Sequence, residues 1–262
     1  MIFETHAHYD DEAFDKDREE LLNKIKESGI GVIVNVASDK ESCETTLRLA
    51  KKYPFIYAAL GVHPSGTAAL SEKDLLKIEG SCSRQSVKNG GRVVAVGEIG
   101  LDYYWDEPAR QTQKIWFEKQ MEMAKRVKLP MVIHSRDAAR DTLDMMKAMD
   151  AGKMGGIIHC YAYSREIAGE FLDMGFSFGI GGVVTFKNAL KLKEVVSFLP
   201  MENIVLETDS PYLAPVPERG KRNSSLNLPL IAEKIAEIKG LTLEETIKIT
   251  EENARRLFSV KE

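Results

Sequence analysis

The chain has 262 residues, 44% of them hydrophobic, which is enough to form the core of one large α/β barrel or of two small domains. Its 36 basic and 40 acidic residues give a net charge of −4, which argues against binding to nucleic acid mainly through bulk positive charge. Three cysteines without zinc or disulfide spacing indicate reduced thiols and a cytoplasmic location. No apolar run approaches transmembrane length, and the first residues lack the features of a signal peptide.

Short apolar runs rich in β-branched residues recur along the chain and predict eight strands. These runs are Ile2–His8, Ile30–Val36, Ile56–Val62, Val93–Ile99, Met131–His134, Gly156–His159, Phe176–Ile180 and Ile204–Glu207. Most of them are followed by stretches with helical period, including Lys16–Ser28, Ala109–Val127, Pro229–Lys239 and, at the end, Leu241–Phe258. Strands that are apolar on both faces and separated by helices pair in parallel, with both faces of the sheet covered.

Eight such units without a break predict an α/β fold, a (β/α)8 TIM barrel that forms a single domain over residues 1–262. In such a barrel the functional groups collect at the carboxyl ends of the strands. An open doubly wound sheet has less support, because no glycine-rich phosphate-binding motif follows the first strand. The irregular stretches Gly80–Gly91 and Pro211–Leu228 are predicted to be loops, and the length of the second is typical of a functional loop.

Metal-binding types of side chain stand at the predicted ends of separate strands. They are His6, His8, Glu98, His134, His159 and Asp209. Side chains alternate along a strand, so His6 and His8 point the same way and can chelate one cation. An isolated pair of this kind fits a buried, hydrogen-bonded histidine equally well, and His134 or His159 alone would fit a core histidine. Their common position at strand ends favours a metal site.

Glu98 follows an apolar strand, where a carboxylate is costly to bury unless it is paired or bound to metal. Its two oxygens make it the natural bridge between two cations; an ion pair with a lysine or arginine is the structural alternative. Asp209 is preferred as a ligand over Glu207, which should lie deeper on the same face and support the site, and Asp102 is interpreted as a loop or supporting residue. Nitrogen and oxygen ligands without a thiolate suit Mg, Mn or Zn and do not select among them.

Four further residues are candidates for binding substrate. His63 ends the third strand and could orient a phosphate or anchor its own loop, and both readings stay open. Arg136 follows His134, where its paired N–H donors could clamp a phosphate, although a solvated position at the start of a helix is the alternative. Lys221 and Arg222 belong to a basic run on the loop after Asp209, which favours contact with phosphate over a merely solvated surface.

Eight motifs spread over almost the whole chain resemble the TatD family of metal-dependent deoxyribonucleases, within the amidohydrolase-like barrel group. The motifs are Thr5-His6-Ala7-His8, Gly61-Val62-His63-Pro64, Gly97-Glu98-Ile99-Gly100-Leu101-Asp102, Ile133-His134-Ser135-Arg136, His159-Cys160-Tyr161, Glu207-Thr208-Asp209-Ser210-Pro211-Tyr212-Leu213, Arg219-Gly220-Lys221-Arg222-Asn223 and Asn253-Ala254-Arg255-Arg256-Leu257-Phe258. The resemblance implies a (β/α)8 barrel that hydrolyses phosphodiester bonds of DNA, often as a 3′-to-5′ exonuclease.

The resemblance also implies two divalent metal ions. One would be held by His6, His8, Glu98 and Asp209, and the other by Glu98, His134 and His159. Two positions depart from the family pattern. Glu4 stands where the family usually has aspartate, and Ser224–Ser225 replaces a usual Glu-Pro, which puts the substrate preference in question but removes no metal ligand.

The expected mechanism is attack on phosphorus by a water activated by two cations, with Glu98 and Asp209 as the catalytic carboxylates. Arg136, Lys221 and Arg222 would hold flanking phosphates of single-stranded DNA, from which the sequence does not separate RNA. We expect a monomer that does not bind membranes. One alternative is an amidohydrolase-type enzyme that cleaves esters, lactones or aminoacyl-tRNA at the same metal centre. The other is a non-catalytic scaffold stabilised by metal.

Overall fold

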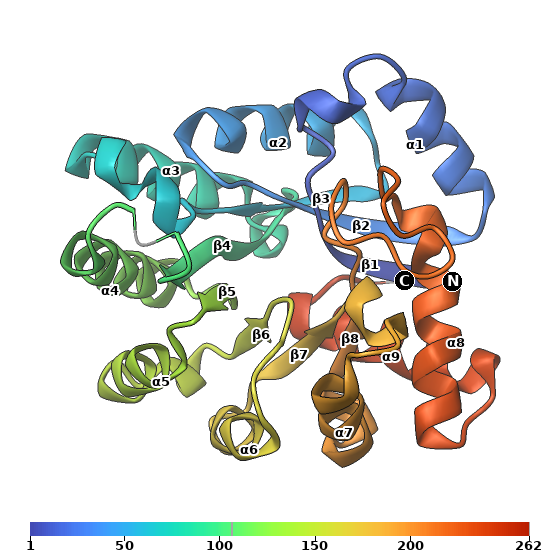
Figure 1. Cartoon of the computed structure of the whole chain (residues 1–262). Helices are drawn as coiled ribbons and strands as arrows, with labels where there is room; N and C mark the ends of the chain where they lie inside the picture. Colours follow the sequence, from blue (N-terminus) through green and yellow to red (C-terminus); the bar gives the residue numbers. More distant parts are fainter. Residues whose placement is uncertain (106, 262) are drawn as a thin grey trace.

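The computed structural model describes residues 1–105 and 107–261, and its eight strands form one parallel sheet. The strands are β1 (Ile2–Ala7), β2 (Ile30–Val36), β3 (Ile56–Leu60), β4 (Val93–Asp102), β5 (Met131–Arg136), β6 (Gly156–Ile158), β7 (Ser177–Ile180) and β8 (Ile204–Leu206). They follow one another around the sheet in chain order, and each is parallel to the next. Figure 1 shows the strands surrounded by helices.

The sheet closes into a barrel where β1 meets the segment that follows β8. The backbone N–H of Asp209 donates to the carbonyl of His6 at 2.9 Å, and the N–H of His8 donates to the carbonyl of Ser210 at 2.8 Å. Ala7 and Ser210 form a parallel bridge between these two bonds. The predicted (β/α)8 barrel is therefore confirmed, and its closing hydrogen bonds involve three of the predicted metal ligands.

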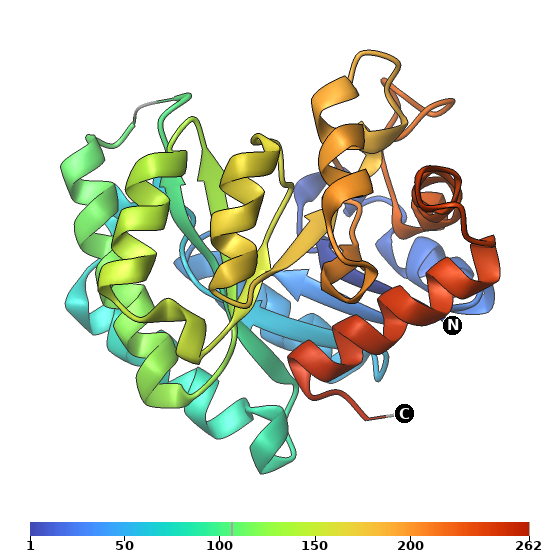
Figure 2. The same cartoon turned by 90° about the horizontal axis from the view of Figure 1, so that it is seen from below.

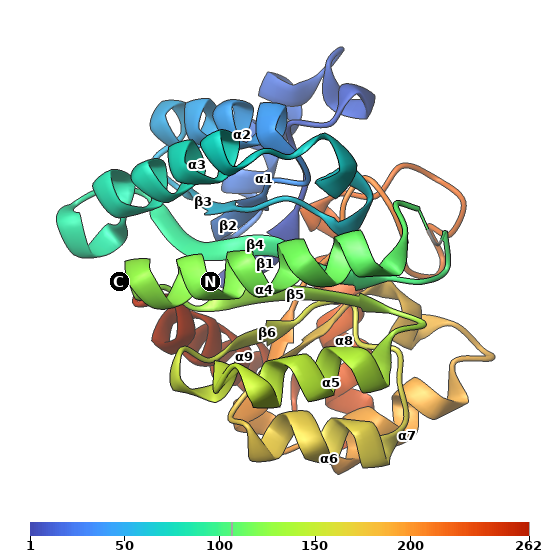
Figure 3. The ribbon, with the colours of Figure 1, turned by 90° about the vertical axis from the view of Figure 1, so that its left-hand side faces the viewer.

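Helices follow the strands in the order that the sequence predicts. They are α1 (Arg18–Glu27), α2 (Lys40–Lys52), α3 (Glu72–Gln85), α4 (Arg110–Val127), α5 (Ala139–Ala148), α6 (Arg165–Asp173), α7 (Leu190–Phe198), α8 (Leu228–Lys239) and α9 (Leu243–Phe258). In the side view, α3, α4, α5 and α6 run along the outside of the strands (Figure 3). None of the helices in the described residues combines the length and apolar character needed to cross a membrane.

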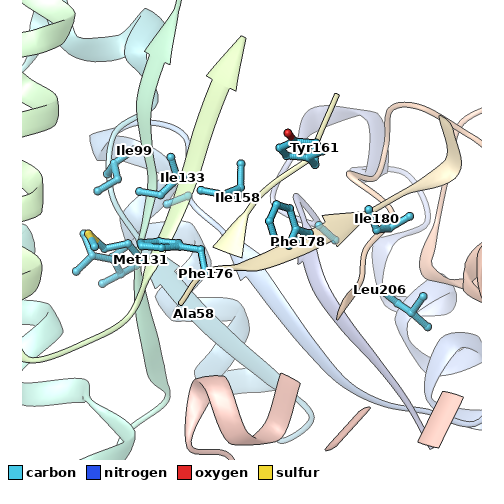
Figure 4. Packing of buried hydrophobic residues seen from close by; sticks show 14 of the residues in the cluster. Ala58, Ile99, Met131, Ile133, Ile158, Tyr161, Phe176, Phe178, Ile180 and Leu206 are labelled. Carbon is cyan, nitrogen blue, oxygen red and sulfur yellow. The ribbon is translucent and has the colours of Figure 1, made fainter. Parts of the chain in front are cut away.

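The main core lies between the strands and the helices, and its side chains pack where neighbouring strands are in register. Ile99, Ile133 and Ile158 lie side by side on β4, β5 and β6, where Ile133 is the register partner of both the others (Figure 4). Side chains alternate along a strand, so His134 and His159, which directly follow two of these isoleucines, face the other way. Because these isoleucines are paired across the strands, the two histidines lie at the same height at the carboxyl ends of β5 and β6.

A smaller cluster joins the last helix to the strands. The ring of Phe258 on α9 stacks on that of Phe3 on β1 with their centroids 6.0 Å apart. Viewed from below, α9 lies across this part of the molecule, close to the N-terminus (Figure 2).

The prediction of a loop over Gly80–Gly91 is wrong in its first half, because α3 continues to Gln85. A capping box between Ser71 and Asp74 starts this helix, and Leu75, Ile78 and Cys82 supply its buried face. The apolar spacing therefore outweighs the serine and glycine residues between them. The loop predicted over Pro211–Leu228 is confirmed, apart from a short 3-10 turn at Ser225–Asn227 immediately before α8.

Candidate metal centre

The structure brings all six predicted ligands together at the carboxyl ends of the strands. His6 lies on β1, Glu98 on β4 and His134 on β5, while the other three ligands follow strand ends. These three are His8 after β1, His159 after β6 and Asp209 after β8. The side chains of His6, Glu98 and His159 are buried, and those of the others are partly exposed to a cavity. Metal binding by these residues itself stays a prediction.

Glu98 divides the four histidines into two pairs. Its Oε2 lies 3.4 Å from Nε2 of His6 and 3.9 Å from Nε2 of His8. Its Oε1 lies 2.7 Å from Nδ1 of His134 and 3.8 Å from Nε2 of His159. One carboxylate therefore faces two groups of nitrogen ligands, each with a different oxygen, as a bridging ligand must.

Asp209 lies between the two pairs of histidines. Its Oδ1 is 3.4 Å from Nε2 of His8 and 3.8 Å from Nε2 of both His6 and His159. The backbone of Asp209 is in the left-handed region, with φ at 57°, which an aspartate tolerates better than most residues. This turn, three residues after the end of β8, aims the carboxylate at the histidines.

The spacing of these donors fits a divalent cation better than a network of hydrogen bonds. The Nε2 atoms of His6 and His8 face each other at 3.1 Å, and most of the nitrogen–oxygen separations are 3.4–3.9 Å, too long for good hydrogen bonds. Two ligands that each lie about 2.0–2.1 Å from one tetrahedral ion are themselves about 3.3 Å apart. The nitrogen and oxygen donors suit Zn and Mn, and Mg to a lesser degree.

Charges inside the site shift the pKa values of its members strongly. Burial acts to lower the pKa of His8, but Asp209 and Glu98 outweigh it and raise the pKa to about 9. Burial opposes charge on His159 too, but Glu207, Glu98 and Asp209 raise its pKa to about 10. Burial works against ionisation of Glu98, yet the surrounding histidines hold its pKa well below the usual range. The carboxylates therefore attract positive charge to this site, as protons or as a metal ion.

Each of three histidines has an oxygen acceptor within 3.2 Å of the ring nitrogen that faces away from the site. Nδ1 of His8 donates to the carbonyl of Val36 at 2.8 Å, so Nε2 faces the site and offers a lone pair to a metal ion once it has lost its proton. Nε2 of His134 is 3.0 Å from Oδ2 of Asp102, so Asp102 is a supporting residue, as predicted. Such contacts orient metal-binding imidazoles and raise their basicity.

The third support is Glu207, which lies beneath His159. Its Oε1 is 3.2 Å from Nδ1 of His159 and accepts the backbone N–H of Cys160 at 2.7 Å. Glu207 is fully buried, which agrees with the predicted deeper position on the same face as Asp209. A Cβ atom on Gly179 would lie 2.0 Å from Oε2 of Glu207, so this glycine provides the space for the carboxylate. Sequence reasoning missed Gly179, although a glycine inside a strand often marks such a close approach.

Replacing Glu207 by glutamine is expected to weaken metal binding about 10- to 100-fold, because the amide is a poorer partner for the Nδ1–H of His159. Competition with a metal chelator measures this change directly. Glu202→Gln, at an exposed glutamate two residues before β8, is the matched control. Equal affinities in wild type and Glu207→Gln would contradict the supporting role.

His63 lines the same cavity, and its ring packs edge-on against that of His134 with centroids 4.3 Å apart. Its Nδ1 accepts the backbone N–H of Ser65 at 3.2 Å, so the predicted loop-anchoring bond exists. Burial lowers the pKa of His63 to about 3, so the ring is neutral and carries its proton on Nε2. His63, Asp102 and His134 lie close enough to hold a cation, but this tautomer offers no lone pair at Nε2.

The ligands open into a cavity of about 810 Å³. In the described part of the chain its lining includes one arginine, Arg136, whose guanidinium lies 3.7 Å above the ring of Tyr104. The carboxylates that line it are Asp10, Asp11, Asp39, Glu41, Glu98, Asp102 and Asp209. A phosphate entering this cavity therefore meets strong repulsion unless cations neutralise the carboxylates.

The structure does not bring Lys221 and Arg222 to the cavity lining. Lys221 pairs with Glu218 at 2.7 Å. Arg222 pairs with Asp17 at 2.5 Å, next to the start of α1, and its guanidinium lies 4.9 Å from the ring centroid of Phe14. The sequence could not reveal this partner, because Asp17 lies 205 residues away along the chain.

Comparison with known proteins identifies the family. The model of the TatD-related DNase family matches residues 3–259. The chain belongs to the TatD family. It is 43% identical to the uncharacterized metal-dependent hydrolase YabD of Bacillus subtilis, over 99% of this chain and 100% of that protein. It is 33% identical to the uncharacterized metal-dependent hydrolase YcfH of Escherichia coli K12, over 99% of this chain and 96% of that protein.

The fold agrees with the same assignment. The crystal structure of YJJV, a TatD homolog from E. coli K12, superposes with a TM-score of 0.91 at 30% identity and covers 99% of this chain and 98% of that one. The protein is a metal-dependent hydrolase of the TatD family, as its motifs predict. The scaffold alternative loses support, because structural metal sites are closed whereas these ligands line an open cavity.

The two positions that are expected to depart from the pattern of the TatD family are in contact. Glu4 is fully buried next to the metal centre, and its Oε2 accepts the hydroxyl of Ser225 at 2.9 Å and that of Thr208 at 2.6 Å. Its Oε1 accepts the N–H of Thr208 at 2.9 Å. The longer carboxylate at position 4 thus reaches a hydroxyl donor that proline could not provide at position 225. The two departures form one buried network.

The loop after β8 is anchored in the same region. Asn223, which is buried, donates to the carbonyls of Thr208 at 2.9 Å and Tyr212 at 2.7 Å, one on each side of Asp209. This part of the predicted basic motif therefore fixes the segment that presents a metal ligand.

Burial raises the pKa of Glu4 to about 8, although the Thr208 and Ser225 hydroxyls act in the opposite direction. Between pH 4.5 and 8 the folded protein then holds a proton that the unfolded chain has released, so the free energy of unfolding falls as pH rises. Glu4→Gln cannot titrate, and its stability relative to wild type should improve by on the order of 4 kcal/mol from pH 5 to pH 8.

Urea unfolding at both pH values, with chelator present, measures this difference. Glu233→Gln on the exposed face of α8 serves as the control and should follow wild type. Parallel pH profiles for wild type and Glu4→Gln would contradict a protonated Glu4.

Proposed function

We propose that this protein uses two divalent cations to hydrolyse phosphodiester bonds of DNA, removing nucleotides from the 3′ ends of single strands. The observation that carries the proposal is the division of the histidines by Glu98, whose two oxygens face different pairs. Paired metal sites of this kind are typical of enzymes that displace groups at phosphorus. We propose that residues 1–262 form a single catalytic domain.

In this proposal one cation is held by His6, His8, Glu98 and Asp209, and the other by Glu98, His134 and His159. Divalent ions bound there, whether Mg, Mn or Zn, supply Lewis acidity that lowers the pKa of water and offsets the charge of a phosphate. The acidic lining of the cavity supports this requirement, because without added positive charge it would repel the substrate.

The protein's own side chains then position the substrate and move a proton. Asp209 accepts the proton of the attacking water, since its side chain is 17% exposed to the cavity whereas that of Glu98 is 5% exposed. His63 donates its Nε2–H to a phosphate oxygen, and Arg136 offers paired N–H donors to the same group. Lys221 and Arg222 are proposed to bind phosphates of the DNA outside the cavity. Arg222 would have to break its ion pair with Asp17 to do so.

Titration of Mg, Mn and Zn into metal-free protein tests the proposal, with single-stranded DNA labelled at one end as substrate. We expect no cleavage in chelator, and with metal a ladder shortening from the 3′ end. Internal fragments would favour endonuclease action, and cleavage of a matched RNA would extend the substrate class. Cleavage that persists in excess chelator, or none with any metal, would refute the proposal. Size-exclusion chromatography and cell fractionation test the accompanying proposal of a cytoplasmic monomer.

A second candidate is an amidohydrolase-type activity on esters, lactones or aminoacyl-tRNA. Seven carboxylates and one arginine among the described lining residues favour it, because such a cavity suits a neutral or cationic reacting group. Rates on a lactone, an aminoacyl-tRNA and single-stranded DNA, measured with the same metal-loaded protein, separate the two. A value of kcat/KM on the lactone or the aminoacyl ester well above that on DNA would favour the second candidate.

A further inference from the structure

The aromatic side chains that face solvent gather at one place. The chain has 20 phenylalanine, tyrosine and tryptophan residues. Over the described residues only Tyr104, Trp105 and Tyr212 are exposed, at 55%, 66% and 54%. Tyr104 and Trp105 follow β4, the strand of Glu98, and Tyr212 follows Asp209. Large rings that stay more than half exposed contribute little to the core, and several of them around one cavity indicate a binding surface.

These rings flank the cavity from two sides, and together we call them the aromatic rim. Trp105 and Tyr212 line the cavity, and the ring of Tyr104 packs edge-on against that of Trp105 with centroids 5.0 Å apart. β4 and β8 are four strands apart in a ring of eight, so their following loops face each other across the mouth (Figure 1). The Tyr212 ring centroid is 6.5 Å from that of His8, beside the metal centre.

The loops that carry the aromatic rim are tied to the metal centre. Oδ1 of Asp102 accepts the backbone N–H of Tyr104 at 2.9 Å, while its Oδ2 is 3.0 Å from Nε2 of His134. The hydroxyl of Tyr212 donates to Oδ2 of Asp11 at 2.9 Å. These bonds hold the two loops in a fixed position relative to the ligands, although all three aromatic residues remain more than half exposed.

We propose that the aromatic rim stacks with unpaired nucleobases on either side of the phosphate that is cleaved. This inference rests on the proposed nuclease function and names how that site would select its substrate. Among the described residues that line the cavity, Arg136 is the single arginine or lysine, so contacts to the bases would have to add to the affinity that the proposed cations give. Flat ring faces accept any base but only when it is unpaired, which explains a preference for single-stranded DNA in physical terms.

The test compares two single strands of equal length and charge. One carries a base at every position, and the other has abasic tetrahydrofuran residues flanking the cleaved phosphate. Trp105→Ala is expected to raise KM for the base-bearing strand about 5- to 100-fold, with a smaller change in kcat. The preference for the base-bearing strand over the abasic strand should fall by the same factor. Tyr212→Leu should act in the same direction, and Trp105→Phe should retain most of the preference.

Trp116→Phe is the matched control, since Trp116 lies on α4 and packs partly against the core. The chain has two tryptophans, so this variant also leaves Trp105 as the single fluorescent reporter. Binding of a phosphorothioate strand to the metal-loaded variant should quench its fluorescence, and the abasic analogue should quench it much less.

Two outcomes would overturn the inference. The first is an unchanged preference for the base-bearing strand in folded Trp105→Ala and Tyr212→Leu. The second is an equal loss on both strands, which would mean that the rings contact sugar and not base. Failure of wild type to cleave either strand would instead refute the nuclease proposal. Base-dependent quenching of Trp105 would still test the aromatic rim in that case.

Discussion

Replacing Glu98 by glutamine is expected to lower kcat for phosphodiester hydrolysis by more than about 100-fold while the barrel stays folded. Glutamine keeps the shape of the side chain, but it loses the charge and puts an NH2 group where one oxygen stood. One of the two histidine pairs that Glu98 faces then lacks its shared oxygen. The measurements are kcat at saturating metal, the number of bound ions by elemental mass spectrometry, and thermal unfolding.

The control is Glu118→Gln on the exposed face of α4, which should behave as wild type. Near-normal turnover by Glu98→Gln with two ions bound would remove the bridging role and with it the proposed mechanism. Loss of activity together with loss of folding would require Glu98→Asp as a second variant, which keeps the charge and shortens its reach.

Adding Mn or Zn to metal-free protein is expected to stabilise the fold by about 4 kcal/mol when the ion is present at 1,000 times its dissociation constant. For a chain of this size that corresponds to a rise in Tm of about 10 °C. The reason is that carboxylates and imidazoles with the spacing of ligands face one another, with Nε2 of His8 3.4 Å from Oδ1 of Asp209 and 3.9 Å from Oε2 of Glu98, and a bound ion would hold them together only in the folded protein. Thermal unfolding in chelator and in added metal measures the shift.

The same binding reaction should release about two protons at pH 7, because the pKa values of His8 and His159, about 9 and 10, keep both charged in the metal-free protein. Metal affinity should therefore increase as pH rises toward those values. Calorimetry in two buffers of different ionisation enthalpy counts the protons. No shift in Tm with any of Mg, Mn or Zn would contradict the metal centre, and binding without proton release would contradict only the charged histidines.

The barrel can be predicted because each unit repeats the same pattern of an apolar strand followed by an amphipathic helix. The candidate ligands can be predicted because functional groups in such a barrel lie at the carboxyl ends of the strands. The extent of individual elements is less visible. β4 runs on to Asp102, three residues past its predicted end. Gly100 permits this, since a Cβ atom there would lie 1.9 Å from the carbonyl oxygen of His134 on the neighbouring strand. The need for a residue without a Cβ atom arises from the neighbouring strand, and in the sequence it is visible only as a glycine.

Contacts between distant parts of the chain explain the rest of what sequence reasoning missed. Arg222 meets Asp17 and Glu4 meets Ser225 only after the barrel has closed. The proton position on His63 depends on Ser65, two residues away, but also on how deeply the fold buries the ring. The sequence shows a run of charged residues or a departure from a motif, but the residues that these side chains contact depend on how the barrel closes.

The closing hydrogen bonds between β1 and the segment after β8 have a consequence for biosynthesis. Two members of the first proposed ion site are made within the first eight residues, and another is residue 209. A nascent chain shorter than that has no place for Asp209 beside His6, whatever helices and strands it has already formed. Loading of the first proposed ion site must therefore wait until residue 209 and the strand before it have left the ribosome, so a chain that ends earlier would lack the complete pair of ion sites.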